Sequence, residues 1–322
     1  MNKILITGGS GFIGTNLLDY LLNSGNKVLN IDKNPPKINS HFSYWNKCDI
    51  NDLDLLKKIT IEFQPNYIIH LAARTDLDGI TIDDYKTNIL GVENIILVSQ
   101  KIDCLQKIIF TSSMLVCKVG YQPLDNFDYK PNTIYGESKV LAEKIVWDNQ
   151  LDCDWSIIRP TSIWGPWFNE PYRFFFDRVI QSKYFHIGSK SGTKTYGYVG
   201  NSVHQIYKIM FSNTKNSLNK VFYIGDNPEN NIEEWANEIA SEVGQKIIRL
   251  PFIIIKLASY FGDFLKLIGV KFPITSFRLK NMTTNNVIDL SNTYEIAKKN
   301  IYNRQEGTRK TLDWITKIKN NS

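Results

Sequence analysis

A tyrosine and a lysine four residues apart are the strongest candidates for chemistry in this 322-residue chain, where they stand in Tyr135-Gly-Glu-Ser-Lys139. On a helix, this spacing places both side chains on one face and within reach of each other. A phenol with a pKa of about 10 is a poor base at neutral pH. A nearby ammonium favours the phenolate. We therefore expect Tyr135 to act as a general base or acid, with Lys139 lowering its pKa.

Hydroxyl groups stand where a neighbouring strand should end. Residues 107–111 (KIIFT) form an apolar run, and Ser112 and Ser113 follow it. Ligands bind at the carboxyl edge of an open parallel sheet, so a hydroxyl there can share a substrate proton with Tyr135. We choose Ser113, and Ser112 and Thr111 stay as alternates because the register is uncertain by one residue. For any single serine, a capping or strand-end hydrogen bond explains the residue equally well.

Three glycines in TGGSGFIG, Gly8, Gly11 and Gly14, separate an apolar run at 3–7 from a helical pattern at 12–23. Between a strand and a helix, such glycines allow a tight turn, close approach of the backbone to a pyrophosphate, and close packing of helix on strand. The helix N-terminus then offers N–H groups and a partial positive charge to the anion. The pattern predicts a site for the diphosphate of a dinucleotide.

An acidic residue, Asp32, ends the next apolar run at 27–31 and stands 18 residues after Gly14. A carboxylate at that strand end can accept hydrogen bonds from the ribose hydroxyls of adenosine and would repel a 2′-phosphate. The position therefore favours NAD over NADP as cofactor, although the neighbouring Lys33 weakens this preference slightly.

The first half of the chain alternates strand and helix patterns. After the runs at 3–7 and 27–31, further apolar runs occur at 67–71 and 107–111, with a helical stretch at 85–100 between them. This alternation predicts right-handed crossovers and a mostly parallel sheet covered on both faces. We expect an α/β fold with a Rossmann-type, doubly wound parallel sheet.

The pattern changes near residue 160, where the strand pattern WSIIRP gives way to the aromatic, Gly/Pro-marked stretch WGPWFNEPYRFFF. We interpret this change as the entry into a smaller, mixed α/β substrate domain. The expected division is an NAD-binding domain at 1–163, rejoined by about 197–222, with 164–322 mainly binding substrate.

The composition of the chain argues against several classes of protein. The net charge of +6 comes from 38 basic and 32 acidic residues that form no basic block, which indicates a solvated surface or attraction of a small anion, not nucleic acid. The four cysteines are far apart and form no CxxC pair, so we expect no disulfide framework and no metal site. The short apolar start suits a buried strand better than a signal peptide. A reducing, cytoplasmic location fits these features.

The most apolar stretch is 251–270, which Lys256, Asp263 and Lys266 interrupt. No run in it approaches the roughly 18 uncharged residues of a spanning helix, so we expect no integral membrane segment. A core or interface helix is the first interpretation, and contact with a membrane surface is the alternative.

Taken together, the glycine-rich turn, Asp32, Ser113, Tyr135 and Lys139 resemble the extended short-chain dehydrogenase/reductase family, in its NAD-dependent nucleotide-sugar epimerase and dehydratase branch. The resemblance covers residues 1 to about 240, with a looser similarity at 289–315. Further matches are Cys-Asp49-Ile50, His70-Leu-Ala-Ala73, Asn88 and the passage Arg159-Pro-Thr-Ser-Ile-Trp-Gly-Pro166.

The resemblance implies two sets of contacts. The residues expected to bind NAD are Gly8, Gly11, Phe12, Ile13, Gly14, Asp32, Asp49, Ile50, Leu71, Ala72, Ala73, Asn88, Tyr135, Lys139 and Pro160. The residues expected to bind substrate are Thr75, Ser113, Asn169 and Lys194.

The implied reaction begins when Tyr135 takes a proton from a sugar hydroxyl while the hydride of that carbon passes to NAD. Lys139 would hold the nicotinamide ribose. The first hypothesis is an epimerase of a nucleotide-diphosphate sugar that passes through a transient 4-keto intermediate. The second is an NAD(P)-dependent reductase or dehydrogenase of a 4-keto-sugar nucleotide or another alcohol or ketone, and the third is a silent binding scaffold. Members frequently dimerise through paired helices, so a homodimer is also implied.

Some positions depart from that family. Dehydratases of this branch carry Asp-Glu directly after the catalytic hydroxyl, whereas Met114 and Leu115 stand there in this chain, which argues against dehydration. Many sugar-nucleotide enzymes have an arginine where Lys194 aligns, and lysine binds phosphate without the bidentate fork of arginine. The usual aspartate just beyond is replaced by Asn201, and Arg278 is the candidate for a later arginine.

Overall fold

The computed structural model describes residues 1–170, 172–188, 191–214, 217–270 and 272–320. Within these residues, the larger lobe contains a seven-stranded sheet in the order β11-β6-β5-β4-β1-β2-β3, and every pairing in it is parallel. The strand order reverses between β1 and β4, which is where doubly wound sheets bind ligands. The strands are β1 (Lys3–Thr7), β2 (Lys27–Asp32), β3 (Trp45–Lys47), β4 (Tyr67–His70), β5 (Lys107–Thr111), β6 (Asp154–Pro160) and β11 (Lys220–Ile224).

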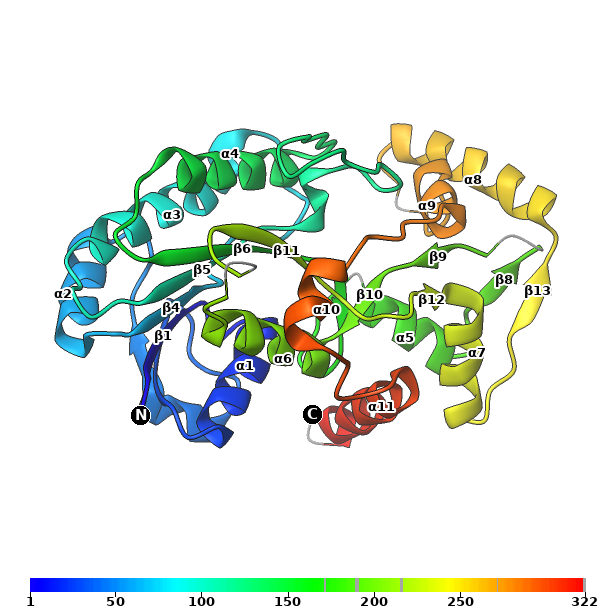
Figure 1. The fold of residues 1–322 in the computed structure, drawn as a ribbon. Helices are drawn as coiled ribbons and strands as arrows, with labels where there is room; N and C mark the ends of the chain where they lie inside the picture. Colours follow the sequence, from blue (N-terminus) through cyan, green and yellow to red (C-terminus); the bar gives the residue numbers. More distant parts are fainter. Residues whose placement is uncertain (171, 189–190, 215–216, 271, 321–322) are drawn as a thin grey trace.

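Two helical layers cover this sheet (Figure 1). Successive strand residues point to opposite faces, so Ile4 and Ile6 of β1 pack in one layer while Leu5 packs in the other. The first layer contains α1 (Phe12–Asn23) and α6 (Val199–Phe211). The second contains α2 (Leu53–Phe63), α3 (Lys86–Ser99) and α4 (Ile134–Asp148). The predicted Rossmann-type α/β fold is confirmed.

The smaller lobe mixes short strand pairs and helices around an aromatic core that includes Trp164, Phe176 and Trp235. Its strands are β7 (Ser162–Trp164) with β10 (Tyr196–Tyr198), β8 (Phe185–Ile187) with β13 (Ile248–Leu250), and β9 (Thr193–Lys194) with β12 (Asn230–Asn231). Its helices are α5 (Tyr172–Ile180), α7 (Ile232–Glu242), α8 (Phe252–Leu267), α9 (Ser276–Thr283) and α11 (Arg304–Asn320), while α10 (Ser291–Ala297) packs on α6 and β11 of the larger lobe. Short 3-10 helices are η1 (Asn39–Tyr44), η2 (Ile82–Tyr85) and η3 (Met114–Val116).

The elements with strong apolar periodicity lie where the sequence predicts them. The bounds of β1, α1 and β5 are the predicted ones, and β2 runs one residue further so that it includes Asp32. The chain returns to the larger lobe through α6 and β11, and β11 pairs with β6 at the edge of the sheet. The sheet of the larger lobe therefore combines strands from distant parts of the sequence.

Of the interpretations of 251–270, a core helix does not fit the structure, while an interface helix and contact with a membrane surface both remain. A helix does form there, as α8, but large apolar side chains such as Leu257 and Phe264 are 62% and 58% exposed. Apolar periodicity shows that a helix has an apolar face, but it does not show what covers that face. Among the described residues, no helix has both the length and the apolar character needed to cross a bilayer.

Candidate active site

Tyr135 and Lys139 lie on the buried face at the start of α4. Thr133 caps the helix, and its Oγ1 accepts a hydrogen bond from the Gly136 N–H at 3.0 Å. A Cβ on Gly136 would lie 2.2 Å from the carbonyl oxygen of Leu115, so only glycine lets α4 pack this closely against η3. The glycine inside the Tyr-Gly-Glu-Ser-Lys motif thereby brings Tyr135 to the loop that carries Ser113.

Of the three candidate hydroxyls, Ser113 is the one that meets Tyr135, through a side-chain hydrogen bond. Ser113 also caps η3, because its Oγ accepts the Leu115 N–H at 3.1 Å. The hydroxyls of Thr111 and Ser112 are buried and have no hydrogen-bond partner in the structure. Among these hydroxyls, that of Ser113 is the one that acts on the Tyr135 pKa, so Ser113 stays the preferred prediction.

Burial controls the ionisation of the pair. It raises the pKa of Tyr135 to about 12, while the hydrogen bond from Ser113 acts in the opposite direction. Burial also lowers the pKa of Lys139 to about 8, against the opposing charge of Glu143. The Lys139 ammonium donates to the Thr111 carbonyl at 2.8 Å. Desolvation therefore dominates the Tyr135 pKa and raises it, opposite to the lowering expected from Lys139.

Two further phenols surround Tyr135, and no motif in the sequence identified them. The ring of Tyr85 lies 5.9 Å from that of Tyr135, and the Tyr85 hydroxyl donates to the Asp76 carbonyl at 2.8 Å. Tyr172 of α5 is close enough to raise the pKa of Tyr135, and its hydroxyl donates to Ser162 Oγ at 2.6 Å. The second lobe thus places Tyr172 near Tyr135.

Asn88 joins α4 to the loop that follows β4. Its Oδ1 accepts the Arg74 N–H at 2.8 Å, and its Nδ2 donates to the Arg74 carbonyl and to Ser138 Oγ, each at 3.0 Å. Ser138 in turn donates to the Tyr135 carbonyl at 2.7 Å. Asn88 is 1% exposed, so these bonds are shielded from water. Asn88 therefore holds the catalytic helix in place against the cofactor-facing loop.

The glycine-rich turn has the geometry that a dinucleotide diphosphate needs. Gly8 has a φ of +75°, and a Cβ there would lie 2.6 Å from the Ala72 nitrogen. A Cβ on Gly14 would lie 2.2 Å from the Gly8 carbonyl oxygen, so α1 packs directly on the turn. Gly11 is the N-cap of α1, and the first-turn N–H groups, including those of Phe12 and Ile13, are available to an anion.

Asp32 lies beside this turn at the end of β2. Its two carboxylate oxygens accept the N–H groups of Ser10 at 3.0 Å and Asn34 at 2.9 Å. Burial raises the pKa of Asp32. The two hydrogen bonds and the charges of Lys33 and Lys37 act in the opposite direction but are smaller effects. A half-buried carboxylate next to the diphosphate turn is well placed for the ribose hydroxyls of NAD.

The remaining cofactor candidates gather at the carboxyl ends of the strands. Leu71, Ala72 and Ala73 follow β4, and the Ala72 N–H donates to Thr7 Oγ1 at 3.3 Å. Pro160 ends β6. Asp49 accepts the Asn51 N–H at 2.9 Å, and the Ile50 carbonyl accepts Asn94 Nδ2 at 2.9 Å, which ties this segment to α3. These residues lie at the edge where an open parallel sheet binds its ligand.

The predicted substrate residues come from both lobes. Thr75 is exposed in the loop after β4, on the same sheet edge as Ser113. Lys194 is half-buried in β9 of the second lobe, and burial lowers its pKa. Asn169 is exposed and lines an open cavity with Lys37 and Trp167, which places it on the Asp32 side of the molecule.

Asn201, which departs from the family, and Arg278, the candidate for its later arginine, both have structural contacts. The Asn201 side-chain amide donates to Asp226 Oδ1 at 3.0 Å and to the Tyr302 carbonyl at 2.9 Å, and its oxygen accepts the N–H groups of Ile301 and Tyr302. Arg278 donates to the Pro273 carbonyl at 3.0 Å within the α8–α9 region. Asn201 therefore fastens the segment before α11 to α6.

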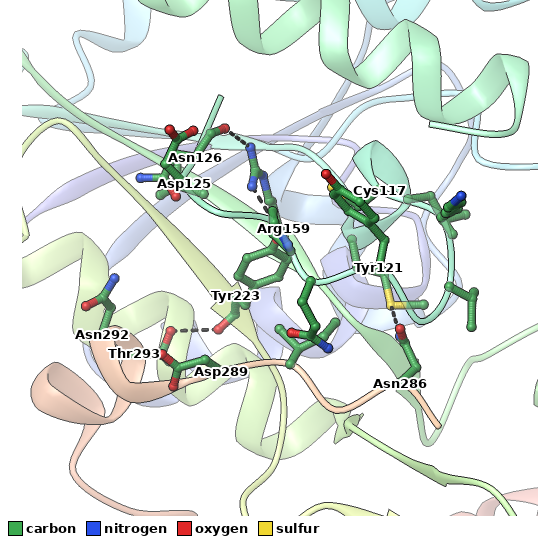
Figure 2. Close-up of a pocket in the computed structure, with 18 residues that line it drawn as sticks. Cys117, Tyr121, Asp125, Asn126, Arg159, Tyr223, Asn286, Asp289, Asn292 and Thr293 are labelled. Carbon is green, nitrogen blue, oxygen red and sulfur yellow. Dashed lines mark hydrogen bonds between the residues drawn. The ribbon is translucent and has the colours of Figure 1, made fainter. Parts of the chain in front are cut away.

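A separate cavity of about 180 Å³ opens on the far side of η3 (Figure 2). Met114 and Leu115 line it, which shows what replaces the acidic pair of dehydratases in this chain. Arg159 lies at its base with its guanidinium paired to Glu143 and hydrogen-bonded to the Asn126 carbonyl and the Tyr223 hydroxyl. These groups occupy the guanidinium, while Lys118, Asp125 and Asp289 also line the cavity.

Comparison with known proteins supports the same assignment. A model of the NAD dependent epimerase/dehydratase family matches residues 4–225. The chain is 27% identical over 323 residues to the N-acetyl-alpha-D-glucosaminyl-diphospho-ditrans,octacis-undecaprenol 4-epimerase of Escherichia coli O157:H7, which covers 97% of this chain and 95% of that protein. It is 28% identical over 267 residues to a 3 beta-hydroxysteroid dehydrogenase/Delta 5-->4-isomerase of Mycobacterium tuberculosis, which covers 76% of this chain and 70% of that protein.

Solved structures show the same fold. The UDP-glucose 4-epimerase of Thermotoga maritima, solved with UDP-glucose, superposes with a TM-score of 0.76 at 20% identity. The match covers 98% of this chain and 99% of that one. Both lobes and their connection are therefore common to the two proteins.

Proposed function

Because the chain belongs to the NAD-dependent epimerase/dehydratase family, we propose that it is a 4-epimerase of a diphosphate-linked sugar, with Tyr135 as its general base and acid. The observation that carries this proposal is the meeting of Tyr135, Ser113 and Lys139 at the carboxyl edge of the sheet. That edge faces the glycine-rich turn across the strand-order reversal, where the cofactor of such a fold binds.

The proton chemistry belongs to Tyr135 and Ser113. Tyr135 takes the proton of the C4 hydroxyl as the C4–H bond breaks, and Ser113 shares that proton through its hydrogen bond to the phenol. When bound, NAD would supply the hydride acceptor and donor for C4. After the 4-keto sugar turns in the cleft, Tyr135 gives the proton back and the hydride adds to the opposite face. The cycle leaves both the protein and the cofactor unchanged.

Lys139 acts through its charge and its position. Its pKa of about 8 leaves it mainly protonated at neutral pH, and the Thr111 carbonyl holds the ammonium next to the Tyr135 turn of α4. From there it can donate to the ribose hydroxyls of the nicotinamide half of the cofactor. A positive charge on that side favours the phenolate of Tyr135 during proton abstraction.

Two carriers fit the proposed substrate. The family resemblance implies a nucleoside diphosphate, whereas the Escherichia coli relative, aligned over nearly the whole chain, acts on a sugar that is linked through diphosphate to undecaprenol. Lys194 and the second lobe would contact the diphosphate in either case. The proposed homodimer would pair through helices of the larger lobe, including α4.

The experiment is an isotope test on the purified protein. A substrate deuterated at C4 is incubated with the enzyme, and the products and the bound dinucleotide are analysed. An epimerase returns the deuterium to C4 of the inverted sugar and accumulates no NADH. Release of a ketone with one equivalent of NADH would contradict the proposal. Supplying the same sugar as UDP, dTDP and polyprenyl diphosphate forms identifies the carrier.

The second candidate is a dehydrogenase that exchanges its cofactor at every turnover. The steroid dehydrogenase relative is the observation that favours it, because that protein is 28% identical over most of this chain. The same isotope test separates the two candidates, since a dehydrogenase would transfer the deuterium to free dinucleotide. Retained dinucleotide in the purified protein supports the epimerase.

A further inference from the structure

The outer face of α8 is apolar and exposed. Its large side chains recur every three or four residues, so they share one side of the helix, and their exposed fractions run from 52% at Ile254 to 85% at Leu267. A single exposed leucine is ordinary, but a continuous patch of this kind marks a binding surface. We call this set the α8 face: Ile253, Ile254, Leu257, Tyr260, Phe261, Phe264 and Leu267.

The opposite side of α8 is packed firmly on the second lobe. Ile255, Ser259 and Gly262 are buried, and a Cβ on Gly262 would lie 1.9 Å from the Ile274 carbonyl oxygen. The Asp263 carboxylate accepts the N–H of Ser276 at the start of α9, at 3.1 Å. These contacts fix the rotation of α8 about its axis. The apolar side of the helix therefore points outward because the opposite side is packed.

Positive charge is concentrated in the same part of the chain. Residues 246–283 contain seven Lys or Arg and one acidic residue, Asp263. Subtracting them from the chain totals of 38 and 32 leaves 31 basic and 31 acidic residues elsewhere, so this segment carries the whole net charge of +6. Arg249 pairs with Glu233 of α7, while Lys256 and Lys266 are exposed beside the α8 face.

We propose that the α8 face docks on an anionic lipid bilayer. A helix with a wide apolar side and flanking lysines lies in the interface, with its apolar side chains among the acyl chains and its ammonium groups at the headgroups. The Lys256 ammonium lies 6.0 Å from the centre of the Tyr260 ring, so a cation and an amphipathic aromatic ring already sit side by side at the edge of the face.

The charge argues for a bilayer and against a second copy of the chain. Two α8 faces brought together would place two segments of net charge +6 against each other, which is repulsive. Anionic headgroups instead neutralise that charge while the acyl region covers the apolar side chains. Figure 1 shows α8 at the outer edge of the second lobe, where a flat surface can approach it. The proposed docking does not depend on which carrier the sugar substrate has.

Vesicle flotation tests this proposal on the full chain. The protein is mixed with vesicles of phosphatidylcholine alone or with added phosphatidylglycerol, at low and high salt. We expect binding to the anionic vesicles and weaker binding as salt rises. Replacing exposed side chains in L257Q/F264Q should weaken binding about 100-fold, since each removes apolar burial that is worth at least tenfold in affinity.

Two variants serve as controls. I61Q removes an exposed apolar residue of α2 and should leave flotation unchanged, while K256E/K266E should remove the preference for anionic lipid. Retention of NAD binding and the same thermal unfolding midpoint show that each variant is folded. A wild-type protein that stays with neither vesicle type overturns the proposal, as does equal flotation of L257Q/F264Q. So does a wild-type dimer that L257Q/F264Q converts to a monomer, if no vesicle binding accompanies it.

Discussion

Arg159 of β6 and Glu143 of α4 form a buried ion pair with two contacts, Nε to Oε1 at 2.9 Å and Nη2 to Oε2 at 2.7 Å. Their side chains are 1% and 2% exposed, and the Tyr129 hydroxyl donates to the same carboxylate at 2.9 Å. Glu143 stands one helical turn after Lys139 on the buried face of α4. The pair therefore fixes the rotation of the catalytic helix relative to the sheet.

Glu143→Gln should destabilise the protein by about 3 kcal/mol, because it leaves the Arg159 charge buried without its counter-charge. Urea unfolding measures this effect. Glu242→Gln is the matched control, since Glu242 pairs with the exposed Arg309 and should cost less than about 1 kcal/mol. Equal losses in the two variants would show that the buried pair has no special role.

Tyr135→Phe should lower kcat by about 100- to 10,000-fold, because it removes the group that transfers the proton. The affinity for NAD should change little, since the ring still fills the same buried position. Steady-state rates and dinucleotide titration measure the two quantities. Tyr207→Phe removes a phenol that packs on the outside of α6 and should keep full activity. A Tyr135→Phe enzyme with normal turnover would remove Tyr135 from the mechanism.

Ser113→Ala should move the pH–rate profile to higher pH, because the hydrogen bond from Ser113 lowers the pKa of Tyr135. Ser112→Ala should leave the profile in place, since the Ser112 hydroxyl is buried without a partner. The profiles of kcat against pH provide the measurement. A shift in the Ser112 variant and none in the Ser113 variant would reverse this assignment.

Asp32→Ser should raise the preference for NADP over NAD by at least about tenfold, because the carboxylate no longer repels the 2′-phosphate or accepts the ribose hydroxyls. Titration with each dinucleotide measures the change. Lys33→Ala alters the neighbouring charge only and should leave NAD preferred. Unchanged selectivity in the Asp32 variant would mean that the ribose lies elsewhere.

His70 should make folding sensitive to acid. Burial lowers its pKa to about 3, and the charge of Lys139 acts in the same direction, whereas the unfolded chain titrates near 6.5. Between pH 6.5 and pH 3, His70 therefore binds a proton in the unfolded state but not in the folded state. The free energy of unfolding is highest above pH 6.5 and falls as the pH drops toward 3. The loss can reach about 4 kcal/mol. Urea unfolding of His70→Gln between pH 7 and 4 should show a flatter dependence than the wild type.

Much of the fold could be predicted from the sequence, because buried parallel strands and their helices leave strong apolar patterns. The runs at 3–7 and 107–111 became β1 and β5 with the predicted bounds. The two-residue strands β9 and β12 are too short to show a period, and their pairing depends on contacts across the second lobe. The exposure of α8 could not be predicted, because the pattern of a covered helix and that of an uncovered one are the same.

The candidate site likewise has a part that could be predicted from the sequence and a part that could not. Tyr135 and Lys139 belong to one short motif and the glycine turn to another, so local geometry predicts the arrangement within each motif. Tyr85 and Tyr172 reach the same cleft from η2 and α5, and only the docking of those elements places their rings near Tyr135. Asn169 is predicted at the substrate, and the structure shows that it lines an open cavity with Lys37.

The pairing of β11 with β6 has a consequence for synthesis on the ribosome. The outer edge of β6 is complete only after Ile224 has been made, roughly sixty residues after β6 itself ends. Until then the nascent chain displays an open, apolar strand edge, which is a template for wrong association. Genetic separation of the two lobes near residue 163 would make that exposure permanent, so neither half should accumulate as an independent polypeptide.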